Sequence, residues 1–170
     1  MFYVLFGLLG VGLLALDQWF KAWVVAHLAL WETAPFLPGI VELMRVHNFG
    51  AAWSSFSGQR WLLLGVTSVL LLGALYVLVR GIVRHPVGIL AACLVISGGI
   101  GNLIDRARLG YVVDMFHFTF WPSYPVFNIA DMCIVVGAIL GGFYYMFLYE
   151  KYDQPKKGES DGASDTPTEH

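Results

Sequence analysis

Two aspartates in the C-terminal half of the sequence are the residues best suited to carry chemistry. Asp114 lies in an aromatic-rich connection between two apolar segments, and Asp131 lies one turn inside the segment that follows, three residues after Asn128. When two carboxyl groups lie close together, the charge on one raises the pKa of the other, so that they share a proton. The ionised member can then take a proton from water, while the protonated member polarises a carbonyl group. We therefore expect Asp114 and Asp131 to act as an acid–base pair.

Further polar side chains lie close to the ends of apolar segments on the same side of the predicted bundle as the two aspartates. They are Asp17, Lys21, Asn48, Asn102, Asp105, Arg106 and Asn128. Polar groups at membrane depth are costly, so a cluster of this size indicates a site whose members pair with one another. Asp17 and Lys21 are four residues apart with the acid first, which is the favourable order for a helical ion pair. Three glycines before Asn102, at positions 98, 99 and 101, predict close packing against a neighbouring helix.

Other catalytic chemistries have weaker support in the sequence. A metal site formed by Asp114, His117 and Asp131 lacks a familiar ligand spacing. His47 and His117 are typical of surface histidines. Ser54, Ser55 and Ser57 lack an evident base-bearing motif, and Cys93 and Cys133 lie inside apolar runs. We therefore expect neither a metal nor another cofactor.

The composition indicates that lipid surrounds most of this chain. Of its 170 residues, 58% are hydrophobic and only 13% are charged, and the mean hydropathy is +0.67. Four apolar segments, at about residues 2–25, 61–79, 87–104 and 126–149, are long enough to cross a bilayer as helices. The sequence thus predicts an all-α integral membrane protein, with residues 1–150 as one four-helix domain and residues 151–170 as a disordered cytoplasmic tail. The alternative of a cleaved signal peptide at the N-terminus lacks a basic start and a small-residue cleavage site.

Basic residues predict the orientation of the four spans. One side of the predicted bundle carries both termini together with Arg80, Arg84, Lys151, Lys156 and Lys157. The opposite side carries Arg45, Arg60, Arg106 and Arg108. This small excess places both termini in the cytoplasm and the polar cluster at the outer face. Alternating residues at positions 40–48 indicate short surface strands, and the aromatic connection 107–125 suits the headgroup boundary. No basic surface suited to nucleic acid is present.

Five sequence blocks, in this order, resemble the bacterial lipoprotein signal peptidase family, also called signal peptidase II. They are Asp17-Gln-Trp-Phe-Lys21, Asn48-Phe-Gly-Ala, Gly98-Gly-Ile-Gly-Asn102-Leu-Ile-Asp105-Arg106, Val112-Val-Asp114 and Phe127-Asn128-Ile-Ala-Asp131. Together they cover roughly residues 10–145. One departure is Met115, where the family usually has phenylalanine after the first catalytic aspartate. Methionine is a flexible apolar side chain, so the departure affects the wall of the site more than the pair.

The resemblance implies a four-helix fold with a small β-sheet and a short helix or loop over the site at the outer membrane surface. It implies an aspartic endopeptidase of the bacterial cytoplasmic (inner) membrane that cuts diacylglyceryl-modified prolipoproteins before the lipidated cysteine. Asp114 and Asp131 would be the catalytic residues. Substrate contacts or site support would come from Asn48, Asn102, Arg106 and Asn128, and structural polar roles from Asp17, Lys21 and Asp105. Membrane lipids and globomycin-type inhibitors are the further partners it implies.

Two readings from other functional classes remain open at this point. A small proton-coupled transporter could use the same aspartates as a relay, which requires polar residues along a path across the bilayer. A non-catalytic scaffold could bind lipidated partners, and it would tolerate Asp114→Asn. The cytoplasmic halves of the predicted spans are almost wholly apolar, which argues against the relay.

Overall fold

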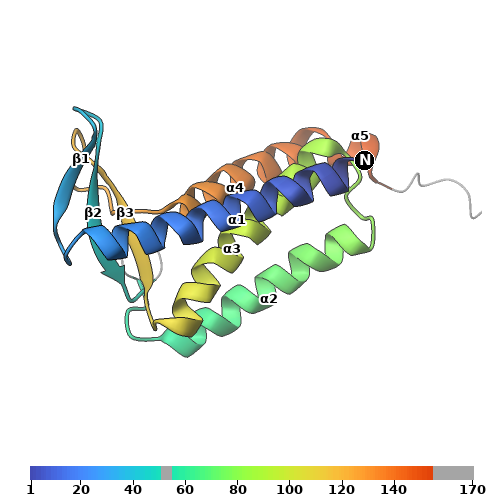
Figure 1. The fold of residues 1–170 in the computed structure, drawn as a ribbon. Coiled ribbons are helices and arrows are strands. Elements are labelled where there is room, and N and C mark those ends of the chain that lie inside the picture. Colours follow the sequence, from blue (N-terminus) through green and yellow to red (C-terminus); the bar gives the residue numbers. More distant parts are fainter. Residues whose placement is uncertain (51–54, 155–170) are drawn as a thin grey trace, which may run out of the picture.

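Four long helices run along one axis in the computed structural model, which describes residues 1–50 and 55–154 (Figure 1). They are α1 (Phe2–His27), α2 (Arg60–Val79), α3 (Pro86–Arg108) and α4 (Ile129–Phe147). Each of them is long and apolar enough to cross a membrane. The short helix α5 (Tyr149–Tyr152) lies at the end of the bundle that carries the N-terminus (Figure 1). Residues 155–170 of the predicted tail lie outside the described residues.

A three-stranded antiparallel sheet lies at the other end of the bundle. Its strands are β1 (Thr33–Leu37), β2 (Val41–Asn48) and β3 (Val112–Phe118), in that order. Gly39 makes the turn between β1 and β2 with a φ of 75°, a backbone conformation that favours glycine. The pairing of Val46 with Asp114, and of Asn48 with Val112, sets the start of β3 beside the end of β2. The sheet thereby carries residues from both long connections into one place.

The structure confirms a strand at positions 40–48, but the expectation that Asp114 lies in a boundary loop was wrong. Asp114 is the third residue of β3, and residues 112–116 are all buried. A strand that is buried on both faces shows no alternation of polar and apolar residues, so its sequence carries no period-two signal. The aromatic residues around it therefore obscured a strand that holds one of the two aspartates.

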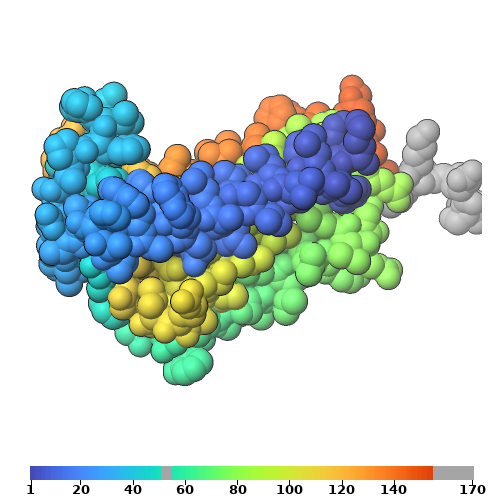
Figure 2. Space-filling model, viewed as in Figure 1, coloured from blue at the N-terminus to red at the C-terminus, as the bar shows by residue number. Residues whose placement is uncertain are grey.

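Helix α3 lies at the centre of the bundle and contacts each of the other three long helices. Its glycines allow these approaches, since a side chain at Gly98 would overlap the backbone carbonyl of Ala130 in α4, and one at Gly101 would meet the Asp17 carboxylate. By contrast, α2 has no buried residue, and its main packing partner among the helices is α3. Figure 2 shows α1 lying along one face of the molecule, where its apolar side chains are exposed for contact with lipid.

The observed end of α3 and the observed start of α4 differ from the ends of the apolar runs in the sequence. Helix α3 continues past residue 104 to Arg108, so Asp105 and Arg106 are helical. Helix α4 begins at Ile129, because Asn128 is its N-cap, whereas the apolar run begins at residue 126. The first difference moves Asp105 and Arg106 from a predicted connection onto a rigid helix, and the second moves Asn128 from a predicted helix to its N-cap.

We predict that Gly98→Ala lowers the free energy of unfolding by about 1–3 kcal/mol, because the added methyl group meets backbone in α4 that cannot move away. Gly142→Ala is the matched control in a long helix, since nothing lies within 4 Å of the position of its added methyl group. Thermal unfolding of both variants in detergent checks this. Equal stability of the two variants would show that α3 and α4 are not in this close contact.

Candidate active site

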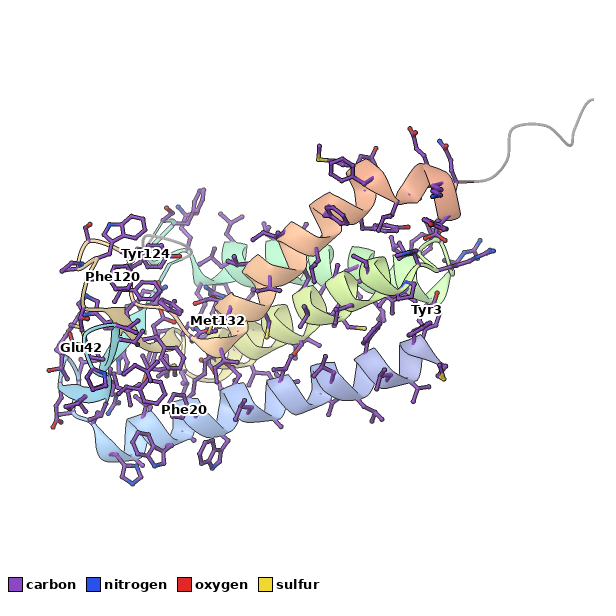
Figure 3. All side chains as sticks on the ribbon, turned by 90° about the horizontal axis from the view of Figure 1, so that it is seen from above. Tyr3, Phe20, Glu42, Phe120, Tyr124 and Met132 are labelled. Carbon is purple, nitrogen blue, oxygen red and sulfur yellow. The ribbon has the colours of Figure 1, made fainter. Side chains whose placement is uncertain are left out.

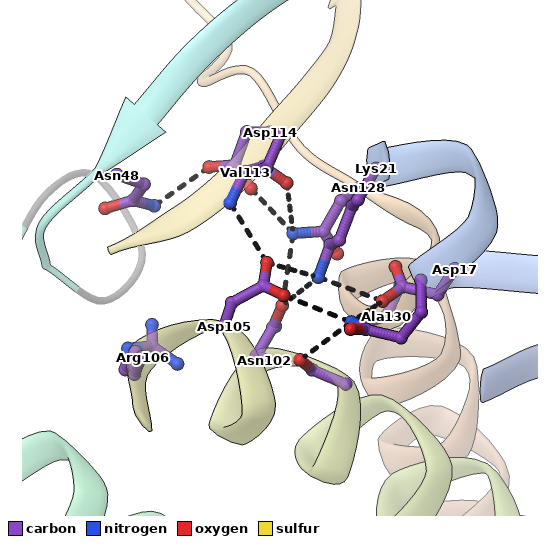
Figure 4. A network of polar contacts seen from close by, with 12 residues as sticks. Asp17, Lys21, Asn48, Asn102, Asp105, Arg106, Val113, Asp114, Asn128 and Ala130 are labelled. Carbon is purple, nitrogen blue, oxygen red and sulfur yellow. Dashed lines mark hydrogen bonds and ion pairs between the residues drawn. The ribbon is translucent and has the colours of Figure 1, made fainter. Parts of the chain in front are cut away.

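Lys21 is the centre of a buried polar cluster at the sheet end of the bundle (Figure 4). Its Nζ lies 2.9 Å from Asp17 Oδ2 and 3.0 Å from Asp105 Oδ2, and it donates a hydrogen bond of 3.0 Å to Asn102 Oδ1. All four residues are at most 5% exposed. An ammonium group has three donors, and here each has its own acceptor. The predicted Asp17–Lys21 pair is therefore present, and it extends to α3.

Asp131 is held at the N-terminus of α4 by three hydrogen bonds. Its backbone N–H donates to Asn128 Oδ1 at 2.8 Å, and its Oδ2 accepts from the backbone N–H of Asn128 at 3.2 Å, which together form a capping box. Its Oδ1 accepts from Asn102 Nδ2 at 2.7 Å. The N-terminal end of a helix stabilises negative charge, so this position offsets part of the cost of placing an ionised carboxylate here.

Asp114 on β3 is 2% exposed, and both of its carboxyl oxygens accept hydrogen bonds from amides. Asn128 Nδ2 donates to Oδ1 at 2.6 Å, and Asn48 Nδ2 donates to Oδ2 at 3.0 Å. The Asn48 side chain is itself fixed, because its Oδ1 accepts from the backbone N–H of Gly50 at 2.9 Å. This turn explains why an Asn-x-Gly sequence follows β2.

Asn128 is fully buried and joins the two aspartates. Its amide oxygen accepts from Asp131 and its amide nitrogen donates to Asp114. Burial and the charge of Asp131 raise the pKa of Asp114, and hydrogen bonds from Asn48 and Asn128 together with the charge of Lys21 lower it, which leaves the pKa of Asp114 at about 7. Such a carboxyl group keeps a proton near neutral pH while its neighbour is ionised, which suits acid–base chemistry.

A cleft of about 380 Å³ opens beside the two aspartates, and it gives them room for water and a substrate backbone. Residues of α2, α3, β3 and α4 line it, including Thr67, Asn102 and Arg106. Arg106 donates through Nη2 to the carbonyl oxygen of Gly50 at 2.8 Å, which places its positive charge at the edge of the cleft. The structure thus brings together all six residues expected at the site, namely Asn48, Asn102, Arg106, Asp114, Asn128 and Asp131. Ala51 of the Asn48 block, with Ala52, Trp53 and Ser54, lies outside the described residues.

The acids expected to be structural tie the site to the bundle. Asp17 Oδ1 accepts from the backbone N–H of Ala130 at 2.9 Å, which links α1 to the first turn of α4. Asp105 Oδ2 accepts from the backbone N–H of Val113 at 3.1 Å, which links α3 to β3. Gln18 was not among the residues expected at the site, yet its Nε2 donates to Asp17 at 3.2 Å and to Asp105 at 3.1 Å. An amide inside an apolar span was the signal that could have identified it.

The two histidines take other positions on the sheet. His117 Nδ1 lies 2.8 Å from Glu42 Oε1 on the neighbouring strand. The His47 ring stacks on the Tyr111 ring, with 3.9 Å between the ring centroids. Burial together with the charge of Arg45 lowers the pKa of His47. Among the residues that the structure describes, no three His, Cys, Asp or Glu side chains are grouped to hold a metal ion.

The chain is similar to known proteins over most of its length. The family described as Signal peptidase (SPase) II matches residues 9–147. Lipoprotein signal peptidases of Streptococcus pyogenes serotypes M6 and M2 are each 47% identical over 132 residues, which cover 75% of this chain and 84% of theirs. One solved structure of a bacterial membrane enzyme matches with a TM-score of 0.77 at 25% identity, covering 92% of this chain and 93% of its own. A second matches with a TM-score of 0.76 at 26% identity, covering 85% and 92%.

We predict that the raised pKa of Asp114 makes stability depend on pH. The folded protein holds this proton up to about pH 7, whereas the unfolded chain loses it near the ordinary value of 3.8. The contribution of Asp114 to the free energy of unfolding is therefore complete below pH 3.8 and is lost as pH rises through about 7. Asp114→Asn removes the titration, so the melting temperature of the variant should rise relative to wild type between about pH 4 and about pH 7 and then stay level.

Thermal melts of the two proteins in detergent across this range provide the measurement. Glu150→Gln serves as the control, because Glu150 is exposed on α5 at the other end of the bundle. A difference between wild type and Asp114→Asn that does not change with pH would contradict a raised pKa at Asp114.

Proposed function

The chain belongs to the signal peptidase II family, and we propose that Asp114 and Asp131 are the catalytic pair with which it removes signal peptides from lipoproteins. It is an aspartic endopeptidase, and it is a membrane protein with four candidate spans in its described part. The observation that carries the proposal is the shared contact with Asn128, which holds the buried carboxyl group of Asp114 and the partly buried carboxyl group of Asp131 at one cleft.

The surroundings of the two aspartates support different roles for them. Asp131 accepts from a backbone N–H and from Asn102 at a helix N-terminus, so it is the member that stays ionised and takes a proton from water. Asp114, whose pKa is about 7, carries the shared proton and donates it to the oxygen of the scissile carbonyl as water attacks the carbon. When the tetrahedral intermediate collapses, Asp131 passes its proton to the leaving nitrogen, and Asp114 takes a proton back from a hydroxyl group of the intermediate. The pair thereby uses one water and returns to its starting protonation state.

The substrates in this proposal are prolipoproteins that carry a diacylglyceryl group on cysteine, with cleavage just before that residue. An apolar groove of about 430 Å³ supports this class, because its wall of aromatic and aliphatic side chains reaches Asp131. It lies between the sheet and α4 and includes Phe36, Phe116 and Met132. Figure 3 shows many aromatic side chains at the sheet end of the bundle, near the labelled Phe120, Tyr124 and Met132. Globomycin-type peptides are expected to bind at the same place.

We place the protein in the bacterial inner membrane, with both termini in the cytoplasm and the site at the outer face. Two arginines of the proposed outer side are engaged by the protein itself. Arg45 donates to the carbonyl of Leu28 at 2.9 Å at the end of α1, and Arg60 donates to that of Ala107 at 2.7 Å near the end of α3. They neutralise helix C-termini. They therefore count less when the basic residues on the two sides of the bundle are compared to predict its orientation. Residues 1–150 form one domain in this proposal, and residues 151–170 a cytoplasmic tail.

A proton-coupled transporter gains no support from the distribution of polar groups. Within the described residues, the buried polar side chains lie at the sheet end, apart from Ser97 in α3. Ser97 donates to the carbonyl oxygen of Gly10 at 2.7 Å and so is satisfied inside the bundle. A relay requires a series of such groups across the bilayer, and Ser97 alone does not provide one.

We predict that Asp114→Asn and Asp131→Asn each lower signal-peptide release by at least about a thousandfold, because each removes a group that transfers a proton. Purified protein in detergent with a diacylglyceryl-modified prolipoprotein provides the assay. Glu42→Gln, which changes another carboxylate of the same sheet, is the matched control and should stay active. Full activity in either aspartate variant would overturn the pair, and loss of wild-type activity with a chelator would indicate a metal mechanism instead.

We predict that kcat/KM falls as pH rises through about 7. Below this value Asp114 keeps its proton while Asp131 is ionised, and above it both carboxyl groups are charged and no proton is available for the carbonyl oxygen. The decline belongs to the pair as a whole. A rate that stays constant from neutral to alkaline pH, with substrate and protein intact, would argue against a shared proton.

A further inference from the structure

We propose that Lys21 is a positioning residue for catalysis, which sets the orientation of the Asn102 amide and, through it, the donors to both aspartates. This inference rests on the proposed function of the pair. It goes beyond the structural ion pair that the sequence suggested, since it gives Lys21 a part in the reaction.

The two ends of the Asn102 amide have different partners. An ammonium group can only donate, so Lys21 at 3.0 Å requires the oxygen of Asn102 to face it. The nitrogen of the amide then points to the other side, where it donates to Asp131 at 2.7 Å. A rotated amide would set its NH₂ group against the ammonium and would take the donor away from Asp131. Lys21 therefore selects the one orientation in which Asn102 serves the catalytic carboxylate.

The same oxygen also fixes the second amide. Asn128 Nδ2 donates to Asn102 Oδ1 at 3.2 Å and to Asp114 Oδ1 at 2.6 Å. Lys21 and Asn128 thus share one acceptor, and the nitrogen of Asn128 is directed to the oxygen that lies beside Asp114. A single buried cation in this way orders the hydrogen-bond donors of both aspartates across α1, α3, β3 and α4.

The positive charge of Lys21 also has a measurable effect on the pKa of Asp114. The charged groups around Lys21 are Asp17 on α1, Asp105 and Arg106 on α3, Asp114 on β3 and Asp131 on α4. Asp17 and Asp105 contact Lys21 directly and are its structural partners. The charge of Lys21 also lowers the pKa of Asp114 and so opposes the effect of burial. Without Lys21 the pair would hold its proton to a higher pH.

The test compares Lys21→Met, and Lys21→Met combined with Asp105→Asn, with the wild-type enzyme. The double variant also removes one of the two buried carboxylates whose charge Lys21 neutralises. In the folded variants we expect kcat to fall about 10- to 100-fold through misplaced groups, with KM changed less than about twofold. The alkaline decline of kcat/KM should also move to higher pH.

Asp17→Asn and Asp105→Asn are the matched controls, because each weakens the ion pair but leaves the bond from Lys21 to Asn102. They should lose thermal stability yet keep most of their kcat and the wild-type pH profile. The proposal is overturned if the Lys21 variants keep kcat and the pH profile, if both controls lose them equally, or if neither Lys21 variant folds. An inactive wild type, or an active Asp114→Asn, would instead refute the catalytic pair itself.

Discussion

The hydrogen bonds of the Asn128 side chain are the contacts on which the rest of the site depends. A buried amide without hydrogen-bond partners costs about 1–3 kcal/mol, so Asn128, which is fully buried, must lie where its partners meet. Those partners are the first turn of α4, the Asp114 carboxyl group on β3 and the Asn102 amide on α3. Satisfying this one side chain therefore brings the two aspartates to the same place.

The surrounding fold can be understood as the means of burying charge at the edge of a membrane. Asp17 and Asp105 are each at most 4% exposed, and Lys21 neutralises part of their charge. Asp17 Oδ1 accepts from a backbone N–H group of α4, and Asp105 Oδ2, which also contacts Lys21, accepts from a backbone N–H group of β3. The same acids therefore fasten α1 and α3 to the elements that carry the aspartates. The rigidity that catalysis requires thus comes from hydrogen bonds that buried carboxylates need in any case.

Patterns within one element were readable from the sequence, whereas contacts between elements were not. The four apolar runs predicted the spans, and the spacing of Asp17 and Lys21 predicted their ion pair, because both depend only on helical periodicity. Strand β3 was missed, since residues buried on both faces do not alternate. The bond from Lys21 to Asn102 joins residues 81 positions apart, and the role of Gln18 likewise depends on how α1 packs against α3. Only the folded bundle sets these distances.

Infrared titration of the carboxyl stretching band tests directly whether Asp114 and Asp131 share one proton near neutral pH. We expect one protonated carboxyl band in the purified wild-type protein that disappears as pH rises through about 7, and that is absent from Asp114→Asn. A wild-type protein without such a band, or a band that persists in Asp114→Asn, would contradict the account.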